Sequence, residues 1–357
     1  MNLEQFLKSM IDVRASDIFV IAGLPLTYQV DGRQVRSDAG PLMPADTEAM
    51  VRAIYEVAGR PFERFAELGN HDEDFSFALP GVGRFRANVF RQRGSLGAVV
   101  RVIPFGLPDP ADFGIPEEVM RIARFQKGLV LVTGPAGAGK STTLACVIDR
   151  LNRERSGHII TMEDPIEYVH RHGSCIVTQR EIPTDVATYA EALRSAMREA
   201  PDVILLGEMR DPETISTAVT AAEMAQLIFS TLHTTGAAGT VDRIIDAFPP
   251  TQQRQIRMQL SMVLQAIVSQ QLVPTVDGGV TPAFEIMVTN TAIRNLIREE
   301  KTHQMDSVIA AGGPEGMRTM DQSLFELVDA GRIARETALQ YAIHLEALEQ
   351  RLAVAGL

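Results

Sequence analysis

The sequence of 357 residues contains no tryptophan and only two cysteines, Cys146 and Cys175. Two cysteines cannot form a disulfide framework or a zinc site of four cysteines, and such sparse use is typical of a reducing compartment. No apolar run reaches the roughly 18 residues that a membrane-spanning helix needs. The first residues also lack the basic and apolar regions of a signal peptide. These absences argue against a secreted disulfide scaffold and predict a cytoplasmic chain.

Basic residues are also in deficit. The chain has 34 Lys and Arg against 45 Asp and Glu, a net charge of −11, which is a poor basis for binding nucleic acid. Only four of the basic residues are lysines, so arginine serves almost wherever a cation is needed. A lysine that persists indicates a place where a planar guanidinium cannot replace a compact ammonium. We interpret Lys140 as such a residue.

The rest of the composition is ordinary for a globular protein, and the length suggests about two domains. Residues 1–103 combine two helical patterns with short alternating strands and an Asp31-Gly32 turn, which predict a small α+β domain. Prolines, Pro104 among them, punctuate residues 104–116, which we interpret as a linker. The expected helices are 3–11 and 47–58, and the expected strands are 17–21, 26–30, 33–36, 74–79, 84–93 and 98–103.

Residues 117–357 have a different sequence pattern, in which apolar runs alternate with helical patterns. This alternation predicts an α/β domain with a parallel sheet covered by helices on both faces. From about residue 250 the pattern is almost wholly helical, apart from a strand near 282–287. The expected strands are 127–133, 158–162, 203–206 and 227–231, and the expected helices are 141–153, 188–199 and 212–224.

The first of these strands leads into a glycine-rich loop. Residues 134–141 read Gly134-Pro135-Ala136-Gly137-Ala138-Gly139-Lys140-Ser141 and match G-x-x-x-x-G-K-[ST] between a strand and a helix. Glycines let backbone N–H groups turn inward around phosphates, and the helix N-terminus adds partial positive charge. We therefore expect Lys140 to reach the β- and γ-phosphates of a bound nucleotide and Ser141 to ligate Mg²⁺.

Three further strands end in chemically active side chains. Glu163 follows strand 158–162, Glu208 follows 203–206, and His233 follows 227–231. Ligands of open α/β sheets bind outside the carboxyl ends of the strands, so these groups should lie near the phosphates. One carboxylate would hold the water shell of the metal and the other would orient or deprotonate the attacking water, while His233 would sense the γ-phosphate. His170 and His172 have no third ligand in register, and we interpret them as exposed loop residues.

Five arginines and no acidic residue lie between residues 84 and 101: Arg84, Arg86, Arg91, Arg93 and Arg101. On strands, Arg84 and Arg86 share one face, and so do Arg91 and Arg93. One interpretation is a solvated face or a patch for anionic lipid or nucleic acid. The other is that some of them act as arginine fingers on the triphosphate held by a neighbouring subunit.

The motifs together resemble those of the secretion ATPase superfamily. Gly134–Thr142, Thr161–Glu167, Gly207–Thr214 and Ser230–His233 are similar, in this order, to its Walker A, aspartate, Walker B and histidine boxes. Pilus-assembly and type II secretion motors of this superfamily usually carry a tetracysteine zinc element, which this chain lacks. Ala292–Glu299 resembles the C-terminal signature of the PilT-type pilus retraction ATPases, and the resemblance covers essentially the whole chain.

The resemblance implies a RecA-like ATPase core with a PAS-like N-terminal domain and a helical C-terminal region. It implies a hexameric, Mg²⁺-dependent ATPase that powers type IV pilus retraction and twitching motility, at the inner-membrane base of the pilus through a platform protein. By the same resemblance Glu163 is the general base, Glu208 acts with Ser141 on Mg²⁺, partly through water, and His233 reads the γ-phosphate. Thr142 adds a phosphate contact, and Arg86, Arg93 and Arg101 are the expected fingers.

Two alternatives stay open. Residues 158–180 also resemble the accessory paralogue PilU, so the chain is either the principal motor or its accessory, with a paralogous retraction ATPase as a further partner. A nucleotide-binding subunit that hydrolyses little ATP alone is the alternative function. A DNA-translocating motor is disfavoured, because the chain is acidic and lacks an aromatic and basic binding surface.

Overall fold

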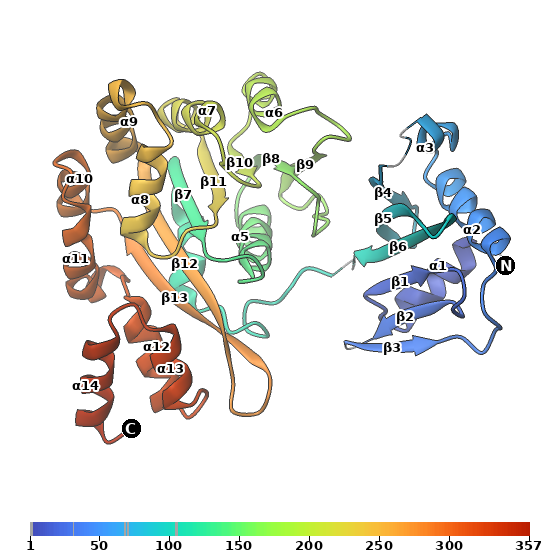
Figure 1. The fold of residues 1–357 in the computed structure, drawn as a ribbon. Helices are drawn as coiled ribbons and strands as arrows, with labels where there is room; N and C mark the ends of the chain where they lie inside the picture. The colour runs from blue at the N-terminus through green and yellow to red at the C-terminus, as the bar shows by residue number, and fades with distance from the viewer. Residues whose placement is uncertain (1–2, 31, 68, 70, 104–105) are drawn as a thin grey trace. The chain divides into compact units, whose positions relative to one another are not determined.

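The structure of the protein, a computed structural model, describes residues 3–30, 32–67, 69, 71–103 and 106–357. The chain forms two compact units, Met1–Gly106 and Leu107–Leu357 (Figure 1). Asp31 of the expected turn and Pro104 of the expected linker lie outside the described residues. None of the helices in the described ranges is long and apolar enough to cross a membrane.

The first unit is an antiparallel sheet with helices packed on it. Its six strands run in the order β3-β2-β1-β6-β5-β4. Alternate residues of β4 and β5, such as Phe75, Phe77 and Phe85, are buried in one core with the apolar sides of α1 and α2. The elements are α1 (Leu3–Asp12), β1 (Asp17–Val20), β2 (Thr27–Val30), β3 (Arg33–Arg36), α2 (Pro44–Val57), α3 (Glu63–Glu67), β4 (Glu73–Leu79), β5 (Gly83–Gln92) and β6 (Ser95–Ile103).

The second unit contains a seven-stranded sheet in the order β13-β12-β7-β11-β10-β8-β9. All neighbouring strands are parallel except β12 and β13. The carboxyl ends of β7, β8, β10 and β11 therefore meet at one edge, as the sequence predicts. The strands are β7 (Gly128–Thr133), β8 (Gly157–Glu163), β9 (Cys175–Glu181), β10 (Val203–Leu206), β11 (Leu227–Leu232), β12 (Leu264–Pro274) and β13 (Val280–Val288).

Helices cover both faces of this sheet, because its side chains alternate between two cores. Leu129 and Leu131 of β7 face α6, α7, α8 and α9, whereas Val130 and Val132 face α4 and α5. The helices are α4 (Glu117–Met120), α5 (Lys140–Glu154), α6 (Tyr189–Ala196), α7 (Pro212–Glu223), α8 (Ala237–Asp246), α9 (Pro250–Val263), α10 (Thr291–Arg298), α11 (Met305–Ala311), α12 (Met320–Asp329), α13 (Arg335–Tyr341) and α14 (Leu345–Ala355), with short 3₁₀ turns η1 (Arg121–Arg124), η2 (Thr302–Gln304) and η3 (Gly313–Glu315).

The chain beyond residue 250 is less helical than the sequence predicts. Residues 264–274 form strand β12, which pairs with β7 in the middle of the sheet and with β13 at its edge. Helix α9 ends at Val263 and β12 begins at Leu264, so no glycine, proline or turn separates them. The expectation of helix over this stretch is wrong, because long-range pairing with β7 decides the conformation and leaves no local signal.

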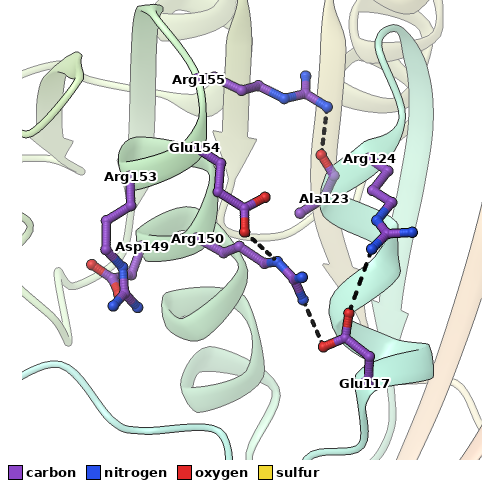
Figure 2. A network of polar contacts seen from close by, with 8 residues as sticks. All are labelled: Glu117, Ala123, Arg124, Asp149, Arg150, Arg153, Glu154 and Arg155. Atoms are coloured by element: carbon purple, nitrogen blue, oxygen red, sulfur yellow. Dashed lines mark hydrogen bonds and ion pairs between the residues drawn. The ribbon is translucent and has the colours of Figure 1, made fainter.

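A network of charged side chains fastens the segment after residue 106 to α5 (Figure 2). The Glu117 carboxylate lies 2.8 Å from Arg150 and 3.9 Å from Arg124, and Arg150 also contacts Glu154 at 3.0 Å. The hydrogen bond from Arg150 holds the pKa of Glu117 below its ordinary value. Arg155 donates to the carbonyl groups of η1 and the following residue. These contacts hold α4 and η1 against the helix that begins at Lys140.

Candidate active site

A cavity of about 430 Å³ opens at the carboxyl ends of β7, β8, β10 and β11. Most of the residues that the sequence singles out line it. The structure thus brings together four segments that lie as much as about 100 residues apart in the chain. The predicted residues in its wall are Ala136, Gly137, Ala138, Gly139, Lys140, Ser141, Thr142, Glu163, Glu208 and His233.

Glycines in the loop before α5 take conformations that other residues rarely adopt. Gly137 and Gly139 have φ of 76° and 86°, and Gly134 has φ of 144°. A Cβ on Gly134 would lie 2.2 Å from the carbonyl oxygen of Gln270, so no larger residue fits there. The backbone can therefore curl tightly in front of the α5 N-terminus, where N–H groups and the helix dipole favour an anion. This cradle fits the phosphates of a nucleotide.

Lys140 is buried in the floor of this loop. Its Nζ donates to the carbonyl oxygens of Gly134 at 2.9 Å and of Pro135 at 2.8 Å, although neither of these two residues lines the cavity. Burial lowers the pKa of Lys140, and the charges of Glu167 and Glu208 oppose that shift. The ammonium is thus held between the loop and two carboxylates, where a phosphate would replace part of its lost hydration.

Glu163 ends β8 and faces the cavity. Its Oε1 accepts hydrogen bonds from Thr161 Oγ1 at 2.6 Å and from Gln179 Nε2 at 3.2 Å. Burial raises the pKa of Glu163 to about 7, against the lowering effect of these two hydrogen bonds. A carboxylate with a pKa near 7 can take a proton from water at neutral pH and release it again, which is the behaviour required of a general base.

Gln179, on the neighbouring strand β9, joins Glu163 to the wall of the cavity. Its amide nitrogen also donates to the Tyr168 carbonyl oxygen at 2.9 Å, and its amide oxygen accepts from the His170 N–H at 2.7 Å. The Tyr168 hydroxyl lies 2.9 Å from Thr142 Oγ1 in the phosphate loop. Sequence reasoning missed Gln179 and Tyr168, because only the pairing of β8 with β9 brings them to Glu163.

Glu208 lines the cavity together with Arg210, His233 and Tyr189. Its side chain is only 13% exposed, and its two oxygens lie 2.5 Å from Arg210 Nε and 3.5 Å from His233 Nε2. Burial and the nearby carboxylates Glu208 and Glu163 raise the pKa of Tyr189, whose ring lines the same cavity. The sequence predicts that Glu208 and His233 lie near the phosphate loop, and the structure places both in the same cavity wall.

The cavity is lined by several oxygen-bearing side chains, among them four carboxylates. Across the ranges that the structure describes, no three His, Cys, Asp or Glu side chains are grouped so that they could hold a metal ion. The cavity does offer the Ser141 hydroxyl and the Glu208 carboxylate, which are hard oxygen donors. Mg²⁺ in nucleotide sites depends on one or two protein oxygens, on substrate phosphates and on retained waters, so this donor set fits it.

His170 differs from its expected exposed position. Its side chain is 8% exposed and lines the cavity, and burial lowers its pKa to about 4. Among the described atoms its Nδ1 has no hydrogen-bond partner. His172 is exposed, as expected, and its Nδ1 accepts from the Val177 N–H. The two histidines therefore do not form a metal pair.

The three expected arginine fingers lie in the first unit. Arg86 and Arg101 are register partners on β5 and β6, and each lies near an acid of the same unit, Asp74 at 3.7 Å and Asp17 at 2.9 Å. Arg93 has φ of 48° in the turn after β5, so the expectation that it shares a strand face with Arg91 is wrong. A turn residue with a left-handed backbone does not continue the alternation of a strand.

Comparisons with known proteins show the family to which the chain belongs. A family described as "Type II/IV secretion system protein" matches residues 115–312. The chain is 47% identical to the type IV pilus retraction ATPase PilT of Pseudomonas aeruginosa, over 96% of this chain and 98% of that one. It is 40% identical to the type IV pilus ATPase PilU of the same organism, over 96% of this chain and 89% of that one. It is also similar to a crystal structure of the pilus retraction motor PilT with bound ADP, with a TM-score of 0.89, 45% identity and coverage of 98% and 99%.

Proposed function

Since this chain is an ATP hydrolase of the type II/IV secretion system protein family, in its group of PilT-like pilus retraction ATPases, we propose that it drives pilus retraction as a Mg²⁺-dependent homo-hexamer. The observation that carries the proposal is the meeting of Lys140, Glu163, Glu208 and His233 in one cavity. A phosphate-binding cation, a carboxylate with a pKa of about 7 and a second carboxylate beside a histidine are the groups that phosphoryl transfer to water requires.

Each residue of the site has a role in ATP binding or hydrolysis that follows from its position. The backbone of residues 134–142 and the Lys140 ammonium hold the phosphates of ATP, and Glu163 takes the proton of the water that attacks the γ-phosphorus. His233, held beside Glu208, contacts the γ-phosphate and distinguishes ATP from ADP. Ser141 and Glu208 would hold Mg²⁺, Glu208 partly through water. When bound, Mg²⁺ supplies positive charge that offsets the negative charge of the β- and γ-phosphates.

Arginines complete the site from a neighbouring subunit. Lys140 is the only cation that the phosphate loop itself supplies, whereas phosphoryl transfer gains on the order of 10³-fold or more from an added arginine. Arg86, Arg93 and Arg101 supply that charge in a ring of six subunits. Arg93 and Arg101 are exposed and Arg86 is partly exposed, and residues 84–101 contain no acid, which supports this role.

The proposed role in pilus retraction indicates which partners the protein needs. A retraction motor at the inner-membrane base of the pilus must act on a platform protein, so that each ATP cycle removes pilin from the fibre. The similarity to both PilT and PilU leaves the protein as the principal motor or as the accessory of a paralogous retraction ATPase. The higher identity to PilT favours the principal motor.

Deletion of the gene in its host tests this function. Loss of twitching with retained or increased surface pili supports a retraction motor, and complementation by the unchanged gene must restore movement. Loss of pili altogether would assign the protein to pilus assembly instead. Normal retraction in the deletion strain, with a requirement only when a paralogue is also weakened, would assign it to the accessory role.

A further inference from the structure

Two consecutive residues of β12 contact two different loops of the active site. Gln270 Oε1 accepts a hydrogen bond from Thr143 Oγ1 at 2.7 Å, in the first turn of α5. Ser269 Oγ accepts from the Gly236 N–H at 2.9 Å, at the start of α8. Successive side chains of a strand point to opposite faces, and these two reach the helices that cover opposite faces of the sheet.

The Gln270 contact lies directly beneath the phosphate loop. Gln270 is 3% exposed and Thr143 is fully buried, so their hydrogen bond is shielded from water. A Cβ on Gly139 would lie 2.9 Å from Gln270 Nε2, and the Gln270 carbonyl oxygen blocks a side chain at Gly134. The side chain and the backbone of one residue therefore bound the loop at both of its ends.

The Ser269 contact has a second support from the next strand. Glu285 of β13 is the register partner of Ser269, and its Oε1 accepts from the Ala237 N–H at 2.7 Å. Glu285 is 5% exposed, and burial raises its pKa. The N–H groups of the N-cap residue Gly236 and of Ala237, the first residue of α8, are thus held by two side chains of the β12–β13 hairpin. Helix α8 follows His233 after only three residues, so this support fixes the end of the loop that carries His233.

We infer that Gln270, Ser269 and Glu285 are positioning residues, which hold the phosphate loop and the His233 loop at a fixed separation for ATP hydrolysis. The inference rests on the proposed function of Lys140 and His233. Catalytic groups misplaced by about 1 Å can lose on the order of 100-fold in rate, so buried supports of this kind affect nucleotide binding or turnover without touching the nucleotide. Because the two contacts serve different loops, their losses should have different kinetic signatures.

The Gln270 contact is tested by Gln270→Leu in the full-length protein, with Gln271→Leu as the matched control one residue further along β12. We expect Gln270→Leu to raise the KM for MgATP and the Kd for a fluorescent ADP analogue about tenfold, because a buried hydroxyl loses its acceptor. The value of kcat should change less than threefold. Thr143→Val should have a similar effect, and the double variant should be little worse than either single variant.

The second contact is tested by Ser269→Ala and Glu285→Leu, which remove the acceptors at the start of α8. We expect kcat to fall about tenfold while the Kd for the ADP analogue stays within about twofold, because these residues serve the γ-phosphate side of the site. Glu285→Gln retains an acceptor oxygen and should restore most of the loss. If Glu285→Leu fails to fold, Ser269→Ala carries the test alone, because it removes only a hydroxyl.

The outcomes separate this inference from the proposed function. If the unchanged protein hydrolyses ATP but Gln270→Leu behaves as Gln271→Leu does, or if all variants change KM and kcat together in proportion to their loss of thermal stability, the positioning role is wrong and the function stands. If the unchanged protein neither binds the ADP analogue nor releases phosphate from MgATP, the proposed function itself fails.

Discussion

The side-chain amide of Gln179 on β9 donates a hydrogen bond of 3.2 Å to the Glu163 carboxylate on β8. The same amide nitrogen donates to Tyr168, and the amide oxygen accepts from the backbone of His170. One side chain thus contacts both the expected general base and the loop that carries Tyr168 and His170. Glu163 therefore depends on a neighbour that no motif of the family resemblance contains.

The first prediction concerns pH. Burial raises the pKa of Glu163 to about 7, and the base must be ionised to accept a proton. ATP turnover should therefore be low at pH 6, rise through pH 7 and level off above about pH 8. The measurement is kcat under saturating MgATP from pH 5.5 to 9, with the oligomeric state checked at each end. A flat profile across pH 7 would remove Glu163 from this role.

The second prediction is that Gln179→Leu moves this profile. Loss of the amide donor takes a stabilising hydrogen bond from the ionised carboxylate, so the pKa of Glu163 should rise and the acidic limb should shift to higher pH. At pH 7 we expect turnover to fall about tenfold, with partial recovery at pH 8.5. Gln126→Leu, at an exposed amide outside the site, is the control. An unchanged limb with lower activity at every pH would indicate a structural role only.

The third prediction separates Lys140 from Glu208. Lys140→Ala should abolish detectable binding of a fluorescent ADP analogue, because the ammonium contacts phosphate in the ground state. Glu208→Gln should bind nucleotide within a few-fold of the unchanged protein and turn over at least 100-fold more slowly, because its contribution is made in the transition state. Normal steady-state turnover by Glu208→Gln would sink the assignment of β10 as the Walker B strand.

The fourth prediction concerns α10, which carries the signature at residues 292–299. Its apolar residues Ile293 and Ile297 are buried, whereas its two arginines differ in their contacts. Arg294 donates to the carbonyl oxygens of Ser261 and Met262 at the end of α9, whereas among the described residues Arg298 donates to Arg294 and Asn295 of its own helix. Arg298→Glu should therefore leave thermal stability and ATP turnover nearly unchanged and abolish retraction in cells.

Arg294→Ala is the informative companion to that variant. It removes two hydrogen bonds to α9 and should lower the free energy of unfolding by about 1–3 kcal/mol. Arg294 and Arg298 therefore differ in what their loss costs the fold. Retraction by Arg298→Glu at the normal level would leave α10 as scaffold alone.

The fifth prediction is that the site is shared between subunits. A variant without Arg86, Arg93 and Arg101 and a Glu208→Gln variant should each be nearly inactive. After subunit exchange, mixtures should recover activity, because some interfaces pair intact arginines with an intact Glu208. Exchange is verified with labelled protomers, and Arg36→Ala on the exposed edge strand β3 serves as the control. Confirmed exchange without recovery at any ratio would contradict the trans role.

The sequence predicts a strand correctly where the residues of that strand form a clear apolar pattern. Strands β7, β8, β10 and β11 are continuous apolar runs, and each expected boundary lies within one residue of the observed one. Their parallel pairing then places Glu163, Glu208 and His233 beside the phosphate loop, as a sheet of this kind requires. These parts of the site follow from periodicity and from a motif with a physical mechanism.

The residues that the sequence could not identify depend on non-local pairing. Strand β12 has two consecutive glutamines and continues directly from a helix. Its own sequence therefore does not indicate that it lies between β7 and β13. The position of Gln270 beneath the phosphate loop therefore cannot be predicted from the sequence. His170 is similar, because its spacing from His172 does not indicate that the fold buries its side chain.

Phosphate release from MgATP by the purified full-length protein, measured beside Glu163→Gln, tests the central claim most directly. The account predicts steady hydrolysis by the unchanged protein and a loss of at least 100-fold in kcat for Glu163→Gln, with binding of a fluorescent ADP analogue retained by both. Equal rates for the two proteins, or nucleotide binding without hydrolysis by the unchanged protein, would contradict it. The second result would leave a nucleotide-binding accessory subunit in place of a motor.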